Sequence, residues 1–438
     1  MTARLCHTGI IWVEEAYPTA AAIQILHAKS LYLDVWFDKP PLLAYTYLLW
    51  GAQIGVPLRI AGAAFVFLCC LGAWKFARDL WGPREGLAAA LATGFFLTFG
   101  IPSAVLALAP DLLMLLPHLT AVFLAWRGRV FWSGLLAGLA MLINVKAAFV
   151  LAACGVWAGR AWPWLLLGFA IPNAAAFAWF GQPYFDQVWR WGLLYSERSF
   201  QLATGFTRTL NWAGFHCALV ASAAYAFWKE KNWRMAGWLL LSLIAVAAGW
   251  RFFPRYYFQL LPVMVLMAAR GYVLLGRRCR VVLLLLLLIP LVRFGPRYVT
   301  LANDLLHDRE TEWSDLVMNQ DSHAAADRID RQGTLLVWGY RPDIFAYTRL
   351  PAGSRFLDSQ PLTGVLADRH LTNSDAVAPE LAARNRHELI QTRPTWIVDG
   401  LGPLNPTLAI TNYPDLRDWL ANYREVGRTR YAVIYRRK

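Results

Sequence analysis

Long apolar stretches between residues 57 and 296 constrain the fold of this chain most strongly. They follow one another with short polar breaks, in a sequence of 438 residues that is 58% hydrophobic and only 16% charged. An ordinary soluble domain does not have this composition, so we expect a polytopic α-helical membrane protein. Several stretches are shorter than the roughly 20 residues of an ideal span, which predicts broken or tilted helices. The candidate spans are residues 57–79, 86–101, 111–126, 130–143, 146–158, 161–180, 207–228, 235–250, 256–275 and 281–296.

The excess of basic charge lies entirely before residue 297. Residues 1–296 contain 24 Lys and Arg against 10 Asp and Glu, whereas residues 297–438 contain 18 of each kind. No basic stripe occurs in that second part, so we expect no nucleic-acid partner. Basic loops favour the cytoplasmic side of a membrane. Five basic clusters are predicted to lie on one face, which we assign as cytoplasmic. They are Lys75, Arg78 and Arg84; Arg127 and Arg129; Arg160; Lys229, Lys231 and Arg234; and Arg277, Arg278 and Arg280.

A change of composition near residue 297 indicates a separate domain. Apolar runs at 334–338, 395–398 and 431–435 predict buried strands, and 303–332, 381–391 and 415–423 predict helices. We therefore expect a transmembrane domain at 57–296 and a small α/β soluble domain at 297–438. The latter has no glycine-rich phosphate loop, nucleophile elbow or metal motif, so we expect it to recognise or position a substrate.

The first 56 residues are predicted to form an outer-face loop with interfacial helices at 14–33 and 41–55. No apolar run of 18 residues precedes Val13. Either the protein begins without a first membrane span or its true start lies upstream, and we favour the second interpretation.

An acid and a base side by side, Asp38 and Lys39, precede two prolines. Prolines fix φ and remove N–H donors, so this pair is predicted to lie on a rigid corner where a helix begins. The ammonium group could bind a phosphate at the membrane surface. The alternative is an interfacial Lys that extends out of the bilayer with Asp38 as its counter-ion.

Isolated carboxylates are predicted on the same, non-cytoplasmic face. Glu14 and Glu15 precede an interfacial helix, and Asp111 is the only acid between Gly86 and Phe185. A carboxylate at membrane depth suggests a functional site. Acids in the first turn of a helix are also favoured by the helix dipole, which is the simpler interpretation of all three.

Isolated cations are predicted on that face as well. Arg251 and Arg255 flank a Pro that would break the helix and expose them, and guanidinium groups suit bidentate contact with phosphate. Lys146 lies between apolar runs. A side chain that simply extends to the membrane interface explains this position equally well. Cations could neutralise a departing phosphate while a carboxylate accepts a proton from an attacking hydroxyl. The same combination could serve the ion relay of a transporter.

A loop at 181–206 is predicted to lie on the outer face. Its aromatic and charged residues indicate an amphipathic segment that rests on the bilayer. It could cover a cleft for a lipid substrate, although an aromatic anchor at the interface is the simpler interpretation.

Residues 33–42, Leu-Asp-Val-Trp-Phe-Asp-Lys-Pro-Pro-Leu, resemble the acidic-Lys-Pro-Pro segment of bacterial polyprenyl-phosphate-sugar glycosyltransferases of the GT-C type. That family includes protein mannosyltransferase-like enzymes, the lipid A aminoarabinose transferase and lipopolysaccharide galacturonosyltransferases. Glu14 and Glu15 fall where the family carries an Asp-Glu pair, with Glu14 at the Asp position. Pro110-Asp111, Lys146 and residues 255–262 resemble other segments of the family more weakly. Residues 336–350 and 396–399 weakly resemble the family's outer soluble domain.

The resemblance implies a GT-C fold, an α-helical polytopic membrane protein with a small C-terminal α/β soluble domain. It also implies the inverting transfer of a hexosyl or pentosyl unit from a polyprenyl-phosphate sugar to an acceptor. That acceptor is a lipid, glycan or protein, and membrane lipids surround the enzyme. The implied location is the inner (plasma) membrane, with the active site and the C-terminal domain extracytoplasmic. The implied catalytic residues are Glu14 or Glu15 as base and Asp111, and the implied substrate-binding residues are Asp38, Lys39, Lys146, Arg251, Arg255 and Tyr256.

Two other functions are compatible with the sequence. One is a transporter or flippase for a lipid-linked sugar, and the other is a catalytically inactive relative, suggested by Glu at the family's Asp position and by the short N-terminus. No metal-ligand cluster or cofactor motif is apparent, and a divalent cation between the acids is an open alternative.

Overall fold

The computed structural model describes residues 2–196, 202–307, 309, 313 and 316–438. They fall into two compact units. Unit 1 comprises Met1–His7, Arg59–Trp179 and Ser199–Arg309, and unit 2 comprises Thr8–Leu58, Phe180–Arg198 and Glu310–Lys438. The division along the chain at residues 57 and 297 stays a prediction.

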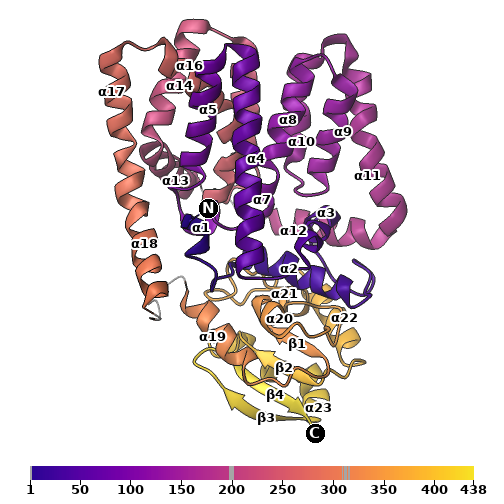
Figure 1. Cartoon of the computed structure of the whole chain (residues 1–438). Coiled ribbons are helices and arrows are strands. Elements are labelled where there is room, and N and C mark those ends of the chain that lie inside the picture. The colour runs from indigo at the N-terminus through magenta and orange to yellow at the C-terminus, as the bar shows by residue number, and fades with distance from the viewer. Residues whose placement is uncertain (1, 197–201, 308, 310–312, 314–315) are drawn as a thin grey trace. The chain divides into compact units, whose positions relative to one another are not determined.

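Unit 1 is helical (Figure 1). Every predicted span overlaps at least one helix, and among the described residues three apolar helical stretches are long enough to cross a membrane, namely Val56–Leu80, Ala147–Leu194 and Arg277–Leu306. The fold class expected from the apolar runs is therefore confirmed. The helices are α1 (Thr2–Leu5), α4 (Val56–Leu80), α5 (Pro83–Phe96), α6 (Pro102–Val105), α7 (Pro110–Leu113), α8 (Leu115–Trp126), α9 (Val130–Met141), α10 (Ala147–Ala158), η2 (Gly159–Ala161), α11 (Trp162–Tyr184), α13 (Leu202–Phe215), α14 (Cys217–Glu230), α15 (Trp233–Ala247), η4 (Pro254–Gln259), α16 (Leu261–Leu274), α17 (Arg277–Leu286) and α18 (Leu288–Leu306).

Small residues and a partly buried ion cluster hold these helices together. A Cβ at Gly168 of α11 would collide with the backbone of Phe131 on α9, so the two helices approach closely because no side chain separates them. Elsewhere Arg270 of α16 donates hydrogen bonds to Glu85 of α5 at 2.7 Å and to Glu230 of α14 at 2.6 Å. This cluster ties three helices that are far apart in the sequence.

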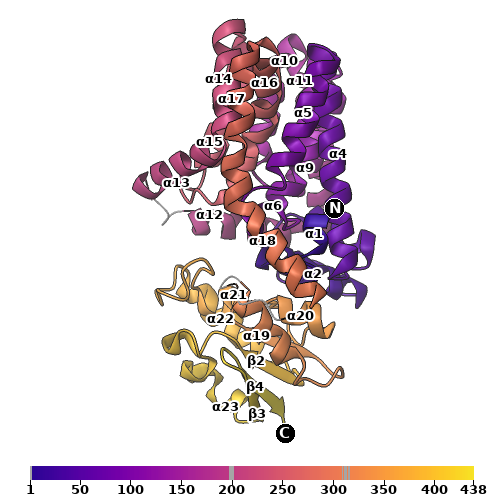
Figure 2. The same ribbon diagram turned by 60° about the vertical axis from the view of Figure 1, so that its left-hand side comes forward.

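Unit 2 contains a four-stranded sheet in the order β1-β2-β4-β3. β1 (Leu335–Trp338) and β2 (Trp396–Asp399) pair in parallel, and β4 (Val433–Arg437) is antiparallel to both β2 and β3 (Tyr423–Arg428). Figure 2 shows β4 between β2 and β3. The three strands predicted from apolar runs are confirmed. β3 was not predicted, because its side chains after Tyr423 are mostly exposed and lack an apolar pattern.

The remaining helices of unit 2 correct two predictions. The single helix expected at 303–332 is wrong, because α18 ends at Leu306 and α19 covers only Val317–Ala326. The helix expected at 415–423 is shorter in the structure, where α23 covers only Arg417–Leu420, since Tyr423 begins an edge strand. The helices are α2 (Val13–Leu26), α3 (Pro41–Tyr47), η1 (Leu48–Trp50), the π-helical turn η3 (Phe185–Arg190), α12 (Trp191–Ser196), α19, α20 (Asp343–Thr348), α21 (Gln360–Thr363), α22 (Pro379–Leu389), η5 (Pro406–Leu408), η6 (Ile410–Asn412), η7 (Pro414–Leu416) and α23 (Arg417–Leu420).

One core joins the distant segments of unit 2. Trp338 and Ile397 of the sheet pack with Phe356, and the same cluster includes Trp36 and Trp191 from the first and middle segments of the chain. The segment that carries Asp38 and Lys39 is therefore anchored by its Trp on the core of the α/β unit.

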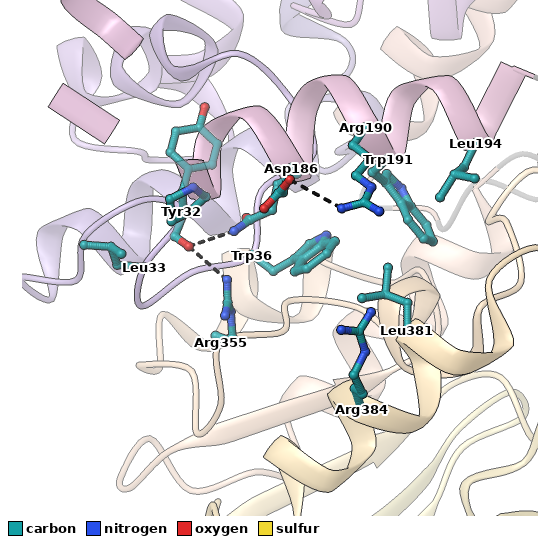
Figure 3. A pocket seen from close by; sticks show the side chains of 12 residues that line it. Tyr32, Leu33, Trp36, Asp186, Arg190, Trp191, Leu194, Arg355, Leu381 and Arg384 are labelled. Carbon is teal, nitrogen blue, oxygen red and sulfur yellow. Dashed lines mark hydrogen bonds and ion pairs between the residues drawn. The ribbon is translucent and has the colours of Figure 1, made fainter. Parts of the chain in front are cut away.

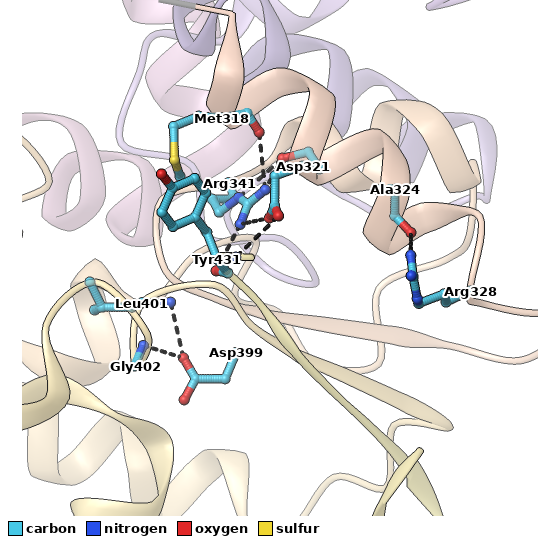
Figure 4. A network of polar contacts seen from close by, with 10 residues as sticks. Met318, Asp321, Ala324, Arg328, Arg341, Asp399, Leu401, Gly402 and Tyr431 are labelled. Atoms are coloured by element: carbon cyan, nitrogen blue, oxygen red, sulfur yellow. Dashed lines mark hydrogen bonds and ion pairs between the residues drawn. The ribbon is translucent and has the colours of Figure 1, made fainter. Parts of the chain in front are cut away.

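A buried arginine ties α19 to the sheet (Figure 4). Arg341 donates hydrogen bonds to Asp321 at 2.9 Å and to the carbonyl groups of Met318 and Tyr431. Nearby, the Asp399 carboxylate at the end of β2 accepts hydrogen bonds from the backbone N–H groups of the following turn. Both side chains therefore help to stabilise the fold of unit 2.

Candidate active site

The residues singled out from the sequence form two groups, one in each unit. Unit 2 contains Glu14, Glu15, Asp38 and Lys39, and unit 1 contains Asp111, Lys146, Arg251, Arg255 and Tyr256. The expectation that the two groups meet in one pocket stays a prediction, so each group is described by itself.

In unit 2 a buried carboxylate supports an accessible ammonium group. Lys39 Nζ lies 3.0 Å from Asp38 Oδ2, and the side chain of Lys39 is 38% exposed whereas that of Asp38 is 6% exposed. The other carboxylate oxygen, Asp38 Oδ1, is buried without a hydrogen-bond partner among the described residues. Asp38 thus orients Lys39, while the ammonium remains open to an anion.

Two tyrosines fix the backbone of this corner. The Tyr32 hydroxyl donates to the carbonyl oxygen of Lys39 at 2.8 Å, and the Tyr17 hydroxyl donates to that of Trp36 at 3.3 Å. Tyr17 also stacks on Phe37 with ring centroids 5.1 Å apart. Pro40 and Pro41 then lead directly into α3, as expected for prolines at a helix start. The corner is rigid because its backbone is held from both sides.

Glu14 and Glu15 lie in the first turn of α2 but differ in their surroundings. Glu15 is buried, and its carboxylate accepts a hydrogen bond from the backbone N–H of Trp12 at 3.4 Å. This contact caps the helix start, which is a structural role. Glu14 is partly exposed. The environment therefore distinguishes two neighbouring acids that the sequence left equivalent.

A further carboxylate, Asp358, belongs to this group and was missed in the sequence. It is buried, and its Oδ1 accepts a hydrogen bond from the backbone N–H of Gln360 at 2.8 Å. Burial, the largest cause, raises the pKa of Asp358 to about 7; the negative charge of Asp38 contributes to this rise, whereas the hydrogen bond from Gln360 and the charge of Lys39 oppose it. Asp358 therefore binds a proton more tightly than an exposed aspartate does. No local motif marks Asp358, because it comes from a loop far along the chain.

In unit 1 the buried Asp111 carboxylate connects two segments. Asn144 Nδ2 donates to Asp111 Oδ1 at 3.1 Å, and Arg255 Nε lies 3.5 Å from Asp111 Oδ2. Asp111 follows Pro110 at the start of α7, and Arg255 follows Pro254 at the start of η4. Both prolines stand at the first helical position, so each charged side chain projects from a helix end. The sequence prediction that these residues share one face is consistent with this contact.

Lys146 and Tyr256 lie together in the same unit. Lys146 Nζ lies 2.8 Å from the centroid of the Tyr256 ring, which is a cation–π contact. The Nζ atom is buried and has no hydrogen-bond partner within the part of the chain that the structure describes. A buried ammonium with spare donors could receive an anionic ligand.

Arg251 lies in a turn with unusual backbone geometry. Gly249, Trp250 and Phe252 all have positive φ, which is strained for the two aromatic residues. The sequence did not single out Arg208, which donates a hydrogen bond to the carbonyl oxygen of Arg251 at 2.6 Å. The side chain of Arg251 itself is buried. Strain that is maintained by a specific contact is typical of functional turns.

The loop expected at 181–206 is mostly helical. The π-helical turn η3 leads into α12, and residues 197–201 lie outside the described residues. Gln187 fastens this segment to the Lys39 corner, since its amide donates to the carbonyl oxygen of Tyr32 at 2.7 Å and accepts from the N–H of Phe37 at 2.9 Å. No group of three or more His, Cys, Asp or Glu side chains within the described residues could hold a metal ion.

Comparisons with known proteins identify the fold. No family model and no curated protein sequence matches the chain. ArnT from Cupriavidus metallidurans bound to undecaprenyl phosphate is similar in structure, with a TM-score of 0.62 at 14% identity over 99% of this chain and 95% of that chain. The apo state of the same protein gives the same TM-score and identity over 98% and 95%. The apo oligosaccharyltransferase of Archaeoglobus fulgidus gives 0.50 at 12% identity over 94% and 69%.

At these identities the likeness concerns the fold, and it confirms the GT-C fold expected from the resemblance.

Proposed function

We propose that this membrane protein of the GT-C fold is a glycosyltransferase, which transfers a sugar from a polyprenyl-phosphate donor to an acceptor lipid, glycan or protein at the outer face of the inner membrane. The observation that carries the proposal is the rigid corner at Asp38 and Lys39, where a buried carboxylate orients an accessible ammonium group. The binding of undecaprenyl phosphate by ArnT, a protein of similar fold, supports a polyprenyl phosphate as the lipid.

In the proposed reaction a bond forms between the acceptor oxygen and the anomeric carbon of the sugar. The bond between that carbon and the phosphate oxygen breaks, and its electron pair leaves with the polyprenyl phosphate. The phosphate gains negative charge as it leaves, so cations aimed at it stabilise the transition state. Lys39 takes this role in the proposal, together with Arg255 and with support from Lys146 and Arg251.

The acceptor proton must go to a base. We assign that base to Glu14, because Glu15 is buried and occupied in capping α2. Asp111 orients the acceptor or the sugar, held in turn by Asn144 and Arg255. Tyr256 contacts Lys146 and limits its movement.

The test is incubation of the purified protein, reconstituted in vesicles, with a panel of polyprenyl-phosphate sugars and lipid or glycan acceptors. The proposal predicts that at least one donor releases polyprenyl phosphate. Movement of labelled lipid across the vesicle membrane without release would favour a transporter instead. Absence of both activities across the panel would favour a catalytically inactive relative.

A further inference from the structure

A cavity of about 400 Å³ lies within unit 2 (Figure 3). Its walls come from the loop after α2, from η3 and α12, and from α22. The volume falls within the range of about 300–1,000 Å³ that is typical of small-molecule sites. The side chains of Asp38 and Lys39 are not among those that line it, so the reaction proposed above leaves the cavity unassigned.

The lining of the cavity is strongly cationic. Arg190, Arg355 and Arg384 line it, and the single carboxylate among the lining residues is that of Asp186. Asp186 lies 4.0 Å from Arg190, at the limit of an ion pair, and Arg384 forms no ion pair with any described residue. Three guanidinium groups opposite one carboxylate favour an anionic ligand.

One of these arginines has an N–H group that donates no hydrogen bond to any described residue. Arg355 uses one terminal nitrogen to donate to the carbonyl oxygen of Tyr32 at 2.9 Å, and the other lies 3.7 Å from Glu388. Its Nε is buried and has no acceptor among the described residues. A buried N–H without an acceptor is costly unless a ligand supplies one.

Beside the cations the cavity has an apolar floor. Trp36 and Trp191 pack edge to face, with centroids 6.1 Å apart, and both belong to the core of the unit. Figure 3 shows Leu381 and Arg384 projecting from α22 toward Trp36. An apolar surface next to guanidinium groups matches a sugar ring, which has an apolar C–H face, when that ring carries a phosphate or a carboxylate.

The walls are also held in place without a ligand. Gln187 bridges Tyr32 and Phe37, and the backbone N–H of Trp36 donates to the carbonyl oxygen of Arg355 at 2.7 Å. A site that is already assembled loses little entropy when it binds.

We infer that this cavity binds an anionic saccharide, a sugar that carries a phosphate or a carboxylate group. We assign this saccharide as the acceptor of the transfer, a step that rests on the proposed function. The acceptor class is then an acidic glycan or glycolipid head group rather than a neutral sugar or an unmodified protein hydroxyl.

The experiment measures equilibrium binding to the full-length protein in detergent, with glucose 6-phosphate and glucuronate as soluble probes and glucose and inorganic phosphate as controls. The inference predicts that an acidic sugar binds more tightly than either control. The double variant Arg190→Gln/Arg384→Gln should weaken that binding about tenfold, because exposed guanidinium groups on both walls are lost. Arg424→Gln removes the same type of charge from the exposed face of β3, outside the cavity, and should leave binding unchanged.

Equal binding of glucose and glucose 6-phosphate, or equal losses in the double variant and Arg424→Gln, would overturn the inference. A second arm uses vesicles that contain a phosphorylated glycolipid. Binding in this arm alone, with the same dependence on Arg190 and Arg384, supports a lipid-linked saccharide, and binding of the soluble probes supports a free glycan.

Turnover separates this inference from the proposed function. If acidic sugars bind but no donor is ever cleaved, the proposed function fails and the binding site stands. If the protein transfers sugar and the double variant has an unchanged KM for the acceptor, the assignment of the acceptor to this cavity fails and the proposed function stands.

Discussion

Replacement of Lys39 by Met removes the charge that we propose binds the donor phosphate, while the length of the side chain is nearly kept. Loss of a single charged donor that is aimed at a developing anion lowers kcat by about 10²–10³. The partly exposed ion pair itself contributes little to folding stability, about 0–1 kcal/mol.

The cost of the Met substitution to stability comes mainly from Asp38. Its carboxylate is 6% exposed, and in Lys39→Met it would have no cation at 3.0 Å. A buried group that loses its partner costs about 1–3 kcal/mol. The double variant Asp38→Asn/Lys39→Met removes the charge that would be left behind, so its stability should return toward that of the original protein.

The assay compares the rate of polyprenyl phosphate release with the midpoint of thermal unfolding in the same preparations. Both variants should lose transfer, and only Lys39→Met should be clearly destabilised. Normal turnover in Lys39→Met would remove this residue from the mechanism. Recovered turnover in the double variant would show that Lys39 acts only by neutralising Asp38.

Three other substitutions test separate parts of the account. Glu14→Gln should lower kcat by about 10²–10⁴ with little change in the unfolding midpoint. Glu15→Gln should mainly destabilise α2, by about 1 kcal/mol. The opposite pattern in paired kinetic and thermal assays would assign the base to Glu15. Burial raises the pKa of Asp358 from 3.8 to about 7, so the folded protein keeps a proton that the unfolded chain releases, and stability should fall as the pH rises through that interval. Asp358→Asn should remove this dependence, on the order of 4 kcal/mol, and an unchanged profile of unfolding midpoint against pH would contradict the assignment. Arg270→Leu leaves the buried Glu85 unpaired and should cost about 3–5 kcal/mol, and the unfolding midpoint should partly recover in Arg270→Leu/Glu85→Leu.

The membrane part was largely predictable because burial in lipid requires continuous apolar helices, and such helices leave a direct pattern in the sequence. Asp111 and Arg255 could also be singled out. A charge beside a Pro in an apolar region has few interpretations, and the two side chains lie 3.5 Å apart. Each of these signals is local, contained within a few neighbouring residues.

The α/β unit was only partly predictable, because its assembly depends on contacts between distant segments. Trp36 and Trp191 have ordinary aromatic surroundings in the sequence, yet both complete the core around the sheet. Asp358 is distinguished only by burial near Asp38, which no spacing indicates. The edge strand β3 has mostly exposed side chains, so period-two alternation could not reveal it.

The most direct test of the account measures two products in one sample of the purified protein, the polyprenyl phosphate released and the acceptor glycosylated. We expect equal amounts of both in the original protein and loss of both in Lys39→Met. Release of lipid phosphate without a glycosylated acceptor, or transport of the intact donor across vesicles with no release, would contradict it.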